Sequence, residues 1–198
     1  LDLLTDYPDI IQRQLLQLWF KIEGVQAPSH LIFNRIFNEL ISARGDKNPI
    51  ITWGDISLRR YRQVMYMLHK QTSIPTNSLL WTPPDTPLSL PVQNSKLLFR
   101  PSNSHLAMKL PKHARFEVRF RVHGERILLN GEHKVLKKLF QQWAIPPWER
   151  GIYPLLFIDN ELAAVPPFCV SDKYKASGDK GVELHFSKNS WYKLSKNV

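Results

Sequence analysis

The chain has 198 residues, 43% of them hydrophobic, and its 27 Lys and Arg against 17 Asp and Glu give a formal net charge of +10. No apolar run approaches the ~20 residues that a membrane-spanning helix needs, and a single cysteine, Cys169, excludes an internal disulfide framework. These features indicate a folded protein of one or two domains in a reducing cytoplasm, with no membrane partner.

The charge is uneven along the chain and favours a polyanionic partner. Residues 1–104 carry 11 Lys and Arg against 8 Asp and Glu, a net of +3, and residues 105–198 carry 16 against 9, a net of +7. A basic domain with interleaved aromatic residues is typical of RNA binding. A basic surface that serves only solubility would show the same totals, so that alternative stays open.

The first predicted elements are two amphipathic helices. Residues 9–23 carry an apolar stripe at helical spacing that we expect to be buried, made of Ile11, Leu15, Leu18, Trp19 and Ile22. Gly24 suits the end of this helix, and Ser29 can cap the next one. The second helix has its own apolar side, made of Ile32, Phe33, Ile36, Phe37, Leu40 and Ile41. Neighbouring helices with a short linker favour an antiparallel pair.

The spacing of the apolar residues then changes from a helical to a strand pattern, which predicts a small β hairpin. Residues 50–61 turn at Gly54 and Asp55, and residues 64–68 extend the pairing. The hairpin carries a cluster of cations at Arg59, Arg60 and Arg62. Guanidinium groups fit phosphate oxygens well, so the cluster is a candidate phosphate contact. The alternative is that these arginines coat an exposed hairpin face.

The middle of the chain is rich in Pro, Ser, Thr and Asn. We interpret residues 81–104 as a connector, in which residues 88–90 and 96–99 can pair as a β hairpin. The predicted fold class is α+β. A mainly helical domain with a small β hairpin spans residues 1–80, and a small basic α/β domain spans residues 105–198.

The second half alternates between strand and helix patterns. Residues 115–122 read as a half-buried strand, whose open face carries Arg115, Glu117, Arg119 and Arg121. Residues 126–129 read as a short strand before a turn at Gly131. A hairpin is expected over residues 153–165, and a last strand over residues 182–186.

A lysine-bearing segment follows Gly131. As a helix, residues 134–143 place an apolar side opposite Lys134, Lys137 and Lys138. Pro146 and Pro147 end the helix, so that Trp148 and Arg150 are displayed just beyond it. An ordinary solvated lysine face is the alternative, and Trp148 suits either a core or a stacked base.

Three strings resemble bacterial tRNA(Ile)-lysidine synthetase. KVLKKLFQQWAIPPWERGIYPLLFIDNELAAV, at residues 134–165, resembles its C-terminal domain. LLQLWFKIEGVQAPSHLIFNRIFNEL and ISLRRYRQVMYML, at residues 15–40 and 56–68, resemble its middle, substrate-binding domain. The resemblance implies a β-sandwich with helices in the second half. It also implies a parent enzyme that uses ATP to join lysine to the wobble cytidine of an isoleucine tRNA, so that a CAU anticodon reads AUA.

The family's N-terminal catalytic domain has a glycine-rich pyrophosphate loop, whereas this chain has eight glycines and none adjacent to another. We therefore expect a piece of a longer protein that is inactive alone, with ATP and magnesium bound in the missing domain. Within this chain we expect no catalytic, cofactor or metal residues, because His123, His133 and Cys169 lack ligand spacing.

The expected partners are isoleucine tRNA, the protein's own N-terminal catalytic domain and a possible second copy in a homodimer. By the resemblance, the best candidates for tRNA contacts are Lys134, Lys137, Lys138 and Arg150. Arg119 and Arg121 come second, and Arg59, Arg60 and Arg62 third. The alternative function is an assembly or dimerisation module without direct RNA contact. The dependence of binding on salt distinguishes these two functions, because RNA binding weakens steeply with ionic strength whereas apolar association does not.

Overall fold

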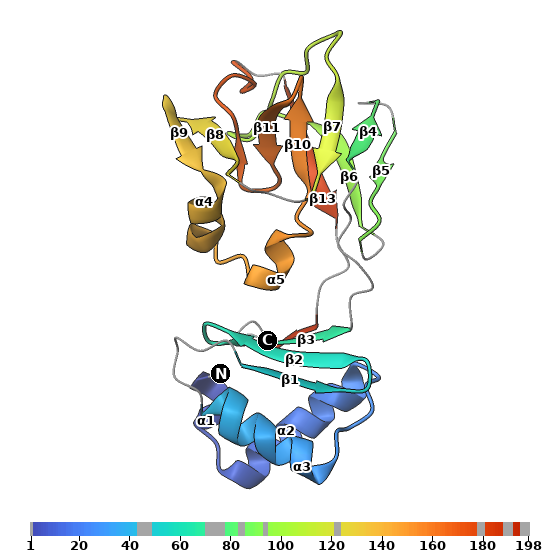
Figure 1. The fold of residues 1–198 in the computed structure, drawn as a ribbon, viewed down its shortest axis with the longest axis vertical. Coiled ribbons are helices and arrows are strands. Elements are labelled where there is room, and N and C mark those ends of the chain that lie inside the picture. The colour runs from blue at the N-terminus through green and yellow to red at the C-terminus, as the bar shows by residue number, and fades with distance from the viewer. Residues whose placement is uncertain are drawn as a thin grey trace. The chain divides into compact units, whose positions relative to one another are not determined.

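The computed structural model describes residues 2–42, 49–69, 78–82, 86–92, 95–120, 124–177, 181–187 and 192–194. The chain divides into two compact units: unit 1 is Leu1–Thr72 with Ser190–Val198, and unit 2 is Ser73–Asn189. Both units combine helices with antiparallel sheets (Figure 1), so the predicted α+β class is confirmed. No helix in the described ranges is both long and apolar enough to cross a membrane.

Unit 1 packs helices against a four-stranded antiparallel sheet (Figure 1). The helices are α1 (Asp2–Thr5), α2 (Asp9–Ile22), α3 (His30–Arg35) and the π-helix η1 (Ile36–Ile41). The strands, in sheet order, are β1 (Ile50–Trp53), β2 (Ile56–Tyr61), β3 (Val64–His69) and β14 (Tyr192–Leu194). The hairpin expected over residues 50–68 is confirmed. The fourth strand comes from the far end of the chain.

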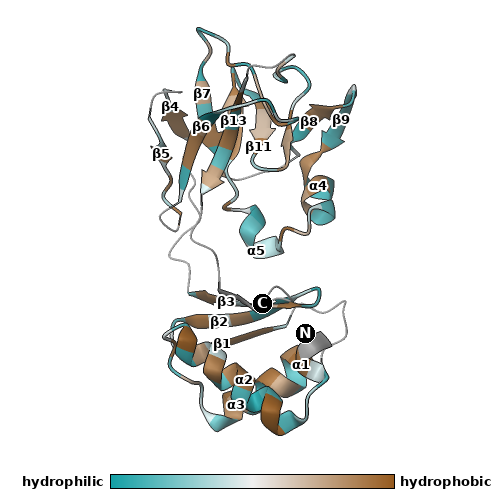
Figure 2. Ribbon diagram, turned by 180° about the vertical axis from the view of Figure 1, so that it is seen from behind, coloured by the Kyte–Doolittle hydropathy of each residue, from teal (hydrophilic) through white to brown (hydrophobic). Residues whose placement is uncertain are grey.

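The second helical segment begins and buries its apolar side as the sequence predicts. Ser29 Oγ accepts a hydrogen bond from the Ile32 amide at 3.5 Å, which caps α3. Phe33, Ile36 and Leu40 are buried in the core against the sheet. Hydrophobic residues also run along β1 and β2 (Figure 2), because these strands supply the other half of that core.

The buried face of α2 differs from the predicted one. Its buried residues are Gln12, Leu16, Trp19 and Phe20. Leu15, Leu18 and Ile22 remain exposed, at 40%, 52% and 70% of their full area. The prediction was right for Trp19 and wrong for Leu15, Leu18 and Ile22, because α2 is apolar on two adjacent sides and periodicity alone fits either stripe. Tertiary packing decides between them, and the Phe20 ring lies 6.2 Å from the Phe33 ring.

Unit 2 is built from small antiparallel sheets and two short helices. The five-stranded sheet has the order β12 (Cys169–Val170), β11 (Glu161–Val165), β10 (Leu155–Ile158), β7 (Phe116–Arg119) and β4 (Leu79–Trp81). The three-stranded sheet has the order β13 (Gly181–Ser187), β6 (Lys96–Ser102) and β5 (Leu88–Ser89). The two-stranded sheet joins β8 (Arg126–Leu129) to β9 (Glu132–Val135), and the helices are α4 (Leu136–Gln142) and α5 (Pro147–Arg150).

Several local predictions in unit 2 are confirmed. β5 pairs with β6 inside residues 81–104, where a hairpin was expected. The β10–β11 hairpin turns at Asp159 and Asn160, both with positive φ, which suits these residue types. β13 is the predicted last strand of this half.

The core of unit 2 joins α4 to the five-stranded sheet. Leu136, Leu139 and Phe140 of α4 pack with buried residues of β10 and β11. Trp143 stacks on Phe168 with ring centroids 4.6 Å apart. Cys169 lies in this core, where burial raises the pKa of its thiol to about 12. The thiol is therefore protonated and unreactive at neutral pH.

Candidate nucleic-acid interface

The predicted lysine face divides between a strand and a helix. Lys134 lies on β9, opposite Ile127 of β8, and its ammonium is 3.7 Å from the Glu132 carboxylate. The helix begins only at Leu136, because Val135 is still extended and pairs with Arg126. The prediction of one helix carrying all three lysines was therefore wrong. Lys134 and Val135 pair with β8, so their backbone does not form the first turn of the helix.

Lys137 and Lys138 form the exposed part of α4. They lie opposite Leu136, Leu139 and Phe140, so the amphipathic pattern is confirmed for this helix. In the part of the chain that the structure describes, neither ammonium has an ion-pair partner. The buried side of α4 fixes the position of the helix, and the two lysines project from its solvent-exposed side.

Arg150 lies on α5, which replaces the expected turn. Pro147 occupies the first helical turn, where its missing amide hydrogen is tolerated. The Arg150 Nε donates a hydrogen bond to the Ile145 carbonyl at 2.9 Å, and the side chain is half-buried. Arg150 therefore ties α5 back to the end of the α4 segment, and it is less exposed than the sequence suggested.

Arg119 is held in a dense set of contacts on β7. Its Nη2 donates hydrogen bonds to Glu117 Oε2, at 2.9 Å, and to Asn160 Oδ1. Its Cζ lies 4.1 Å from the centre of the Phe157 ring, within cation–π range. The hydrogen bond from Arg119 lowers the pKa of the Glu117 carboxyl.

Glu117 is not on an open face, as the strand alternation predicted, but is buried. On this face the Glu117 side chain lies between its cross-strand neighbours Phe157 of β10 and Leu80 of β4, and Arg119 donates a hydrogen bond to it. Arg119 is therefore positioned by its neighbours, and Arg121 lies outside the described residues.

The three arginines of the β2 hairpin do not form one cluster. Arg60 is buried, and its guanidinium donates hydrogen bonds to the Leu40 and Ile41 carbonyls at 3.0 and 2.9 Å. Arg59 points to the opposite face of the strand, where its Nε donates to Ser57 Oγ and partial burial lowers its pKa. Arg62 is exposed in the turn, with its Cζ 5.7 Å from the Tyr61 ring centre. Arg60 thus caps the end of η1.

Two aspartates hold turns of unit 2 through long-range contacts that the sequence reasoning missed. Asp172 Oδ2 accepts a hydrogen bond from the Gly131 amide at 2.9 Å, which pins the β8–β9 turn beside the lysines. This hydrogen bond is the main reason that the pKa of Asp172 is lowered. Asp159 Oδ1 accepts one from the Arg115 amide at 2.8 Å. Neither partner is near in sequence, so no local pattern reveals these contacts.

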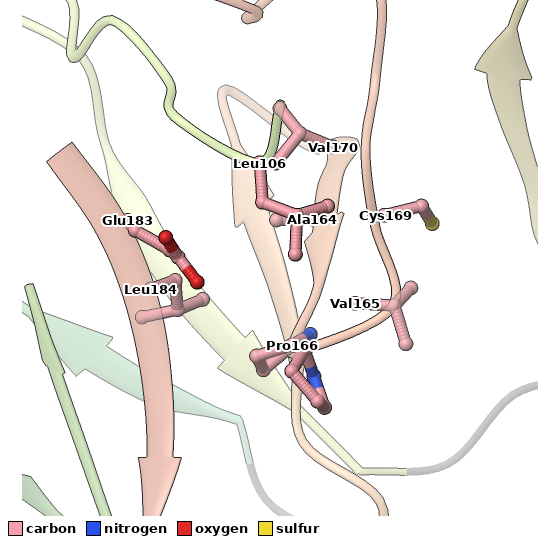
Figure 3. Close-up of a pocket in the computed structure, with 9 residues that line it drawn as sticks. Leu106, Ala164, Val165, Pro166, Cys169, Val170, Glu183 and Leu184 are labelled. Atoms are coloured by element: carbon pink, nitrogen blue, oxygen red, sulfur yellow. The ribbon is translucent and has the colours of Figure 1, made fainter. Parts of the chain in front are cut away.

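A small pocket of about 10 Å³ lies among β11, β12 and β13 (Figure 3). Its lining is apolar except for Glu183, whose carboxylate accepts hydrogen bonds from Ser102 and Ser104 Oγ at 2.8 and 2.7 Å. These hydrogen bonds lower the pKa of Glu183. Its carboxylate is therefore already satisfied within the protein. Over the described ranges, no group of three or more His, Cys, Asp or Glu side chains is arranged to hold a metal ion.

Comparison with known proteins identifies two domains of one family. The model of the TilS substrate binding domain matches residues 1–66, and that of the TilS substrate C-terminal domain matches residues 116–186. The tRNA(Ile)-lysidine synthase of Legionella pneumophila (strain Paris) is 37% identical over 161 residues, covering 81% of this chain and 37% of that protein. The enzyme of that name from Pectobacterium atrosepticum is 33% identical over 152 residues, covering 76% of this chain and 34% of that protein.

One solved structure, a TilS C-terminal domain, covers 58% of this chain and 100% of its own, with 21% identity and a TM-score of 0.44. The chain spans little more than a third of the length of the curated relatives named above.

Proposed function

The chain belongs to the TilS family, and on that premise we propose that it is the tRNA-holding part of a tRNA(Ile)-lysidine synthase. In this proposal it grips an isoleucine tRNA while another part of a longer polypeptide attaches lysine to the wobble cytidine. Both family models that match are named for substrate domains, and the relatives are named for a reaction on tRNA(Ile). By the family resemblance, ATP and magnesium would then be bound in that other part.

The observation that carries the proposal is the pair of exposed ammonium groups on α4. Lys137 and Lys138 lack carboxylate partners among the described residues, whereas Arg60 and Arg119 are engaged by the protein itself. A charge without an internal partner can bind a phosphate without first giving up a contact within the protein. We therefore rank Lys137 and Lys138 first as tRNA contacts and Lys134 next, because it must leave Glu132. Arg62 and Arg59 are secondary contacts in unit 1.

Contacts of this kind bind the RNA backbone and set its register, and they carry little base information. Selection among similar tRNAs would then follow from where the held stem places the anticodon. The turn anchored by Asp172 and the buried side of α4 fix the backbone that carries the lysines, so binding has to order only their side chains.

A salt titration tests the proposal. The chain is titrated with isoleucine tRNA bearing a CAU anticodon and, separately, with methionine tRNA, at several salt concentrations. If about three to five phosphates are neutralised, log K falls against log salt with a slope of roughly −3 to −4. Replacing Lys134, Lys137 and Lys138 by alanine flattens the slope by up to about three units.

Lys112→Ala is the matched control, because it removes one exposed charge from the same unit outside α4 and β9. Equal effects of Lys137→Ala and Lys112→Ala would mean that only the overall charge matters. An unchanged slope in the triple variant would overturn the α4 assignment and favour an assembly role without RNA contact.

A further inference from the structure

RNA binding leaves one surface of unit 1 unexplained, the apolar stripe formed by Ile11, Leu15, Leu18 and Ile22 on α2 (the α2 stripe). We propose that the α2 stripe docks an amphipathic helix from the part of the same polypeptide that lies outside this chain. The proposal rests on membership of a family of longer proteins. It is independent of whether the lysines of α4 bind RNA.

The spacing of the α2 stripe specifies the shape of its partner. The four residues are separated by four, three and four positions, which is the a/d spacing of a heptad repeat. Such a seam is narrower than the apolar face of a helix that packs into a globular core. It fits the side of a second helix better than a loop or a flat surface.

The α2 stripe is a second apolar side, separate from the one that the core already uses. The core contains Leu16, Trp19 and Phe20. Leu15, Leu18 and Ile22 stay exposed at 40–70% of their full area, and Ile11 is half-buried. Polar residues border the α2 stripe on its outer side, at Gln14 and Lys21. Exposed apolar side chains that line up at heptad spacing are unfavourable in water, and they are expected where another helix covers them.

The size of the α2 stripe argues for a covalently linked partner. α2 has 14 residues, so it is about 21 Å long, and with a helix width of about 10 Å its footprint is about 210 Å². A stable complex of separate proteins buries about 800 Å² on each side. The α2 stripe alone is therefore too small to hold a separate molecule such as a second copy. A tethered helix has a high effective concentration and needs far less area.

The lengths of the relatives supply a source for that helix. The chain covers 37% of the Legionella enzyme and 34% of the Pectobacterium enzyme. Well over half of each relative thus lies outside the matched region.

Cysteine labelling tests the proposal, because the natural chain should react only slowly with a maleimide. Cys169 is its only cysteine, and burial raises the pKa of that thiol to about 12. Leu18→Cys places a reporter on the α2 stripe, and Leu15→Cys repeats it. Gln17→Cys is the matched control, because Gln17 is exposed on the same helix but off the α2 stripe. Maleimide labelling rates are read by mass spectrometry of the α2 peptide, in this 198-residue chain and in the full natural polypeptide.

In the 198-residue chain, cysteines at 18 and 17 should react at rates within about threefold of each other. In the full polypeptide, labelling at 18 should slow at least tenfold, whereas labelling at 17 should change less than twofold. Equal reactivity at 18 in both proteins would overturn the proposal, as would a natural polypeptide no longer than this chain.

Two further results would show that the α2 stripe binds a partner other than the tethered helix. Protection of residue 18 in the short chain that grows with protein concentration would identify a second copy. Protection that appears only when tRNA is added would assign the surface to RNA. A negative labelling result leaves the salt titration of the α4 lysines unaffected, so the two proposals fail separately.

Discussion

Arg60 offers the sharpest test of the difference between a structural cation and an RNA contact. Its guanidinium is buried and hydrogen-bonded to the carbonyls of Leu40 and Ile41, at the end of η1. Truncation by Arg60→Ala leaves both buried carbonyls without those donors. An orphaned buried polar group costs about 1–3 kcal/mol, so the two together cost about 2–6 kcal/mol of unfolding free energy.

Native-state hydrogen exchange measures this loss in each unit separately. A destabilisation of about 3 kcal/mol speeds exchange through global opening by a factor of about 10². The slowest amides of unit 1 should show this acceleration in Arg60→Ala, and those of unit 2 should not change. Arg62→Ala removes the same charge from an exposed turn of the same hairpin, and it should change stability by less than about 0.5 kcal/mol.

Arg60→Met refines the test, because it keeps an apolar stem but removes the donors. It should be nearly as destabilising as Arg60→Ala. The reasoning is refuted if Arg60→Ala leaves exchange in unit 1 unchanged. It is also refuted if that variant lowers the salt slope of tRNA binding while the protein remains fully stable.

Three further outcomes are expected. The chain alone should release no pyrophosphate when mixed with ATP, lysine and tRNA, and turnover above background would contradict the proposed division of the protein. Because its folded pKa is lowered, Asp172 should contribute stability that is complete above its unfolded pKa of about 3.9 and is lost as the pH falls toward the folded value. Asp172→Asn should therefore weaken the acid dependence of unit 2 unfolding, and an identical dependence would exclude the Gly131 contact as its source. Phe140→Ala should cost about 3–5 kcal/mol in urea unfolding of unit 2, since the side chain is 2% exposed, and a cost below 1 kcal/mol would contradict the assigned core.

Local sequence signals were sufficient to predict the structure where one short-range interaction decides the backbone conformation. The Ser29 cap needs only a hydroxyl and an amide three residues later. The β10–β11 turn needs only Asp159 and Asn160, which tolerate positive φ. The amphipathic pattern was also sufficient for residues 136–142, since Leu136, Leu139 and Phe140 fall on one side of that helix and are buried.

Predictions failed where distant contacts choose between two local options. The apolar residues of α2 fit two stripes, and Phe33 from the next helix selects the one that contains Phe20. Lys134 suits a helix, but the ladder with Ile127 holds it on a strand. Arg60 looked like one of three surface cations, although it shares a face of β2 with the apolar Leu58, which was a usable signal that it faces the core.

The pairing of β14 with β3 affects how this protein is made. Tyr192 lies opposite Met67, so the last strand of the unit 1 sheet is synthesised after the whole of unit 2. Unit 2 is thus an insertion in the chain of unit 1. Domains usually fold in order from the N-terminus on the ribosome, but here unit 1 can complete its sheet only after unit 2 has been synthesised. Until residue 194 emerges, β3 has an open edge that can pair with another nascent chain. Expressing residues 1–66 alone, as the family boundary suggests, would make that edge permanent and remove the end of β3.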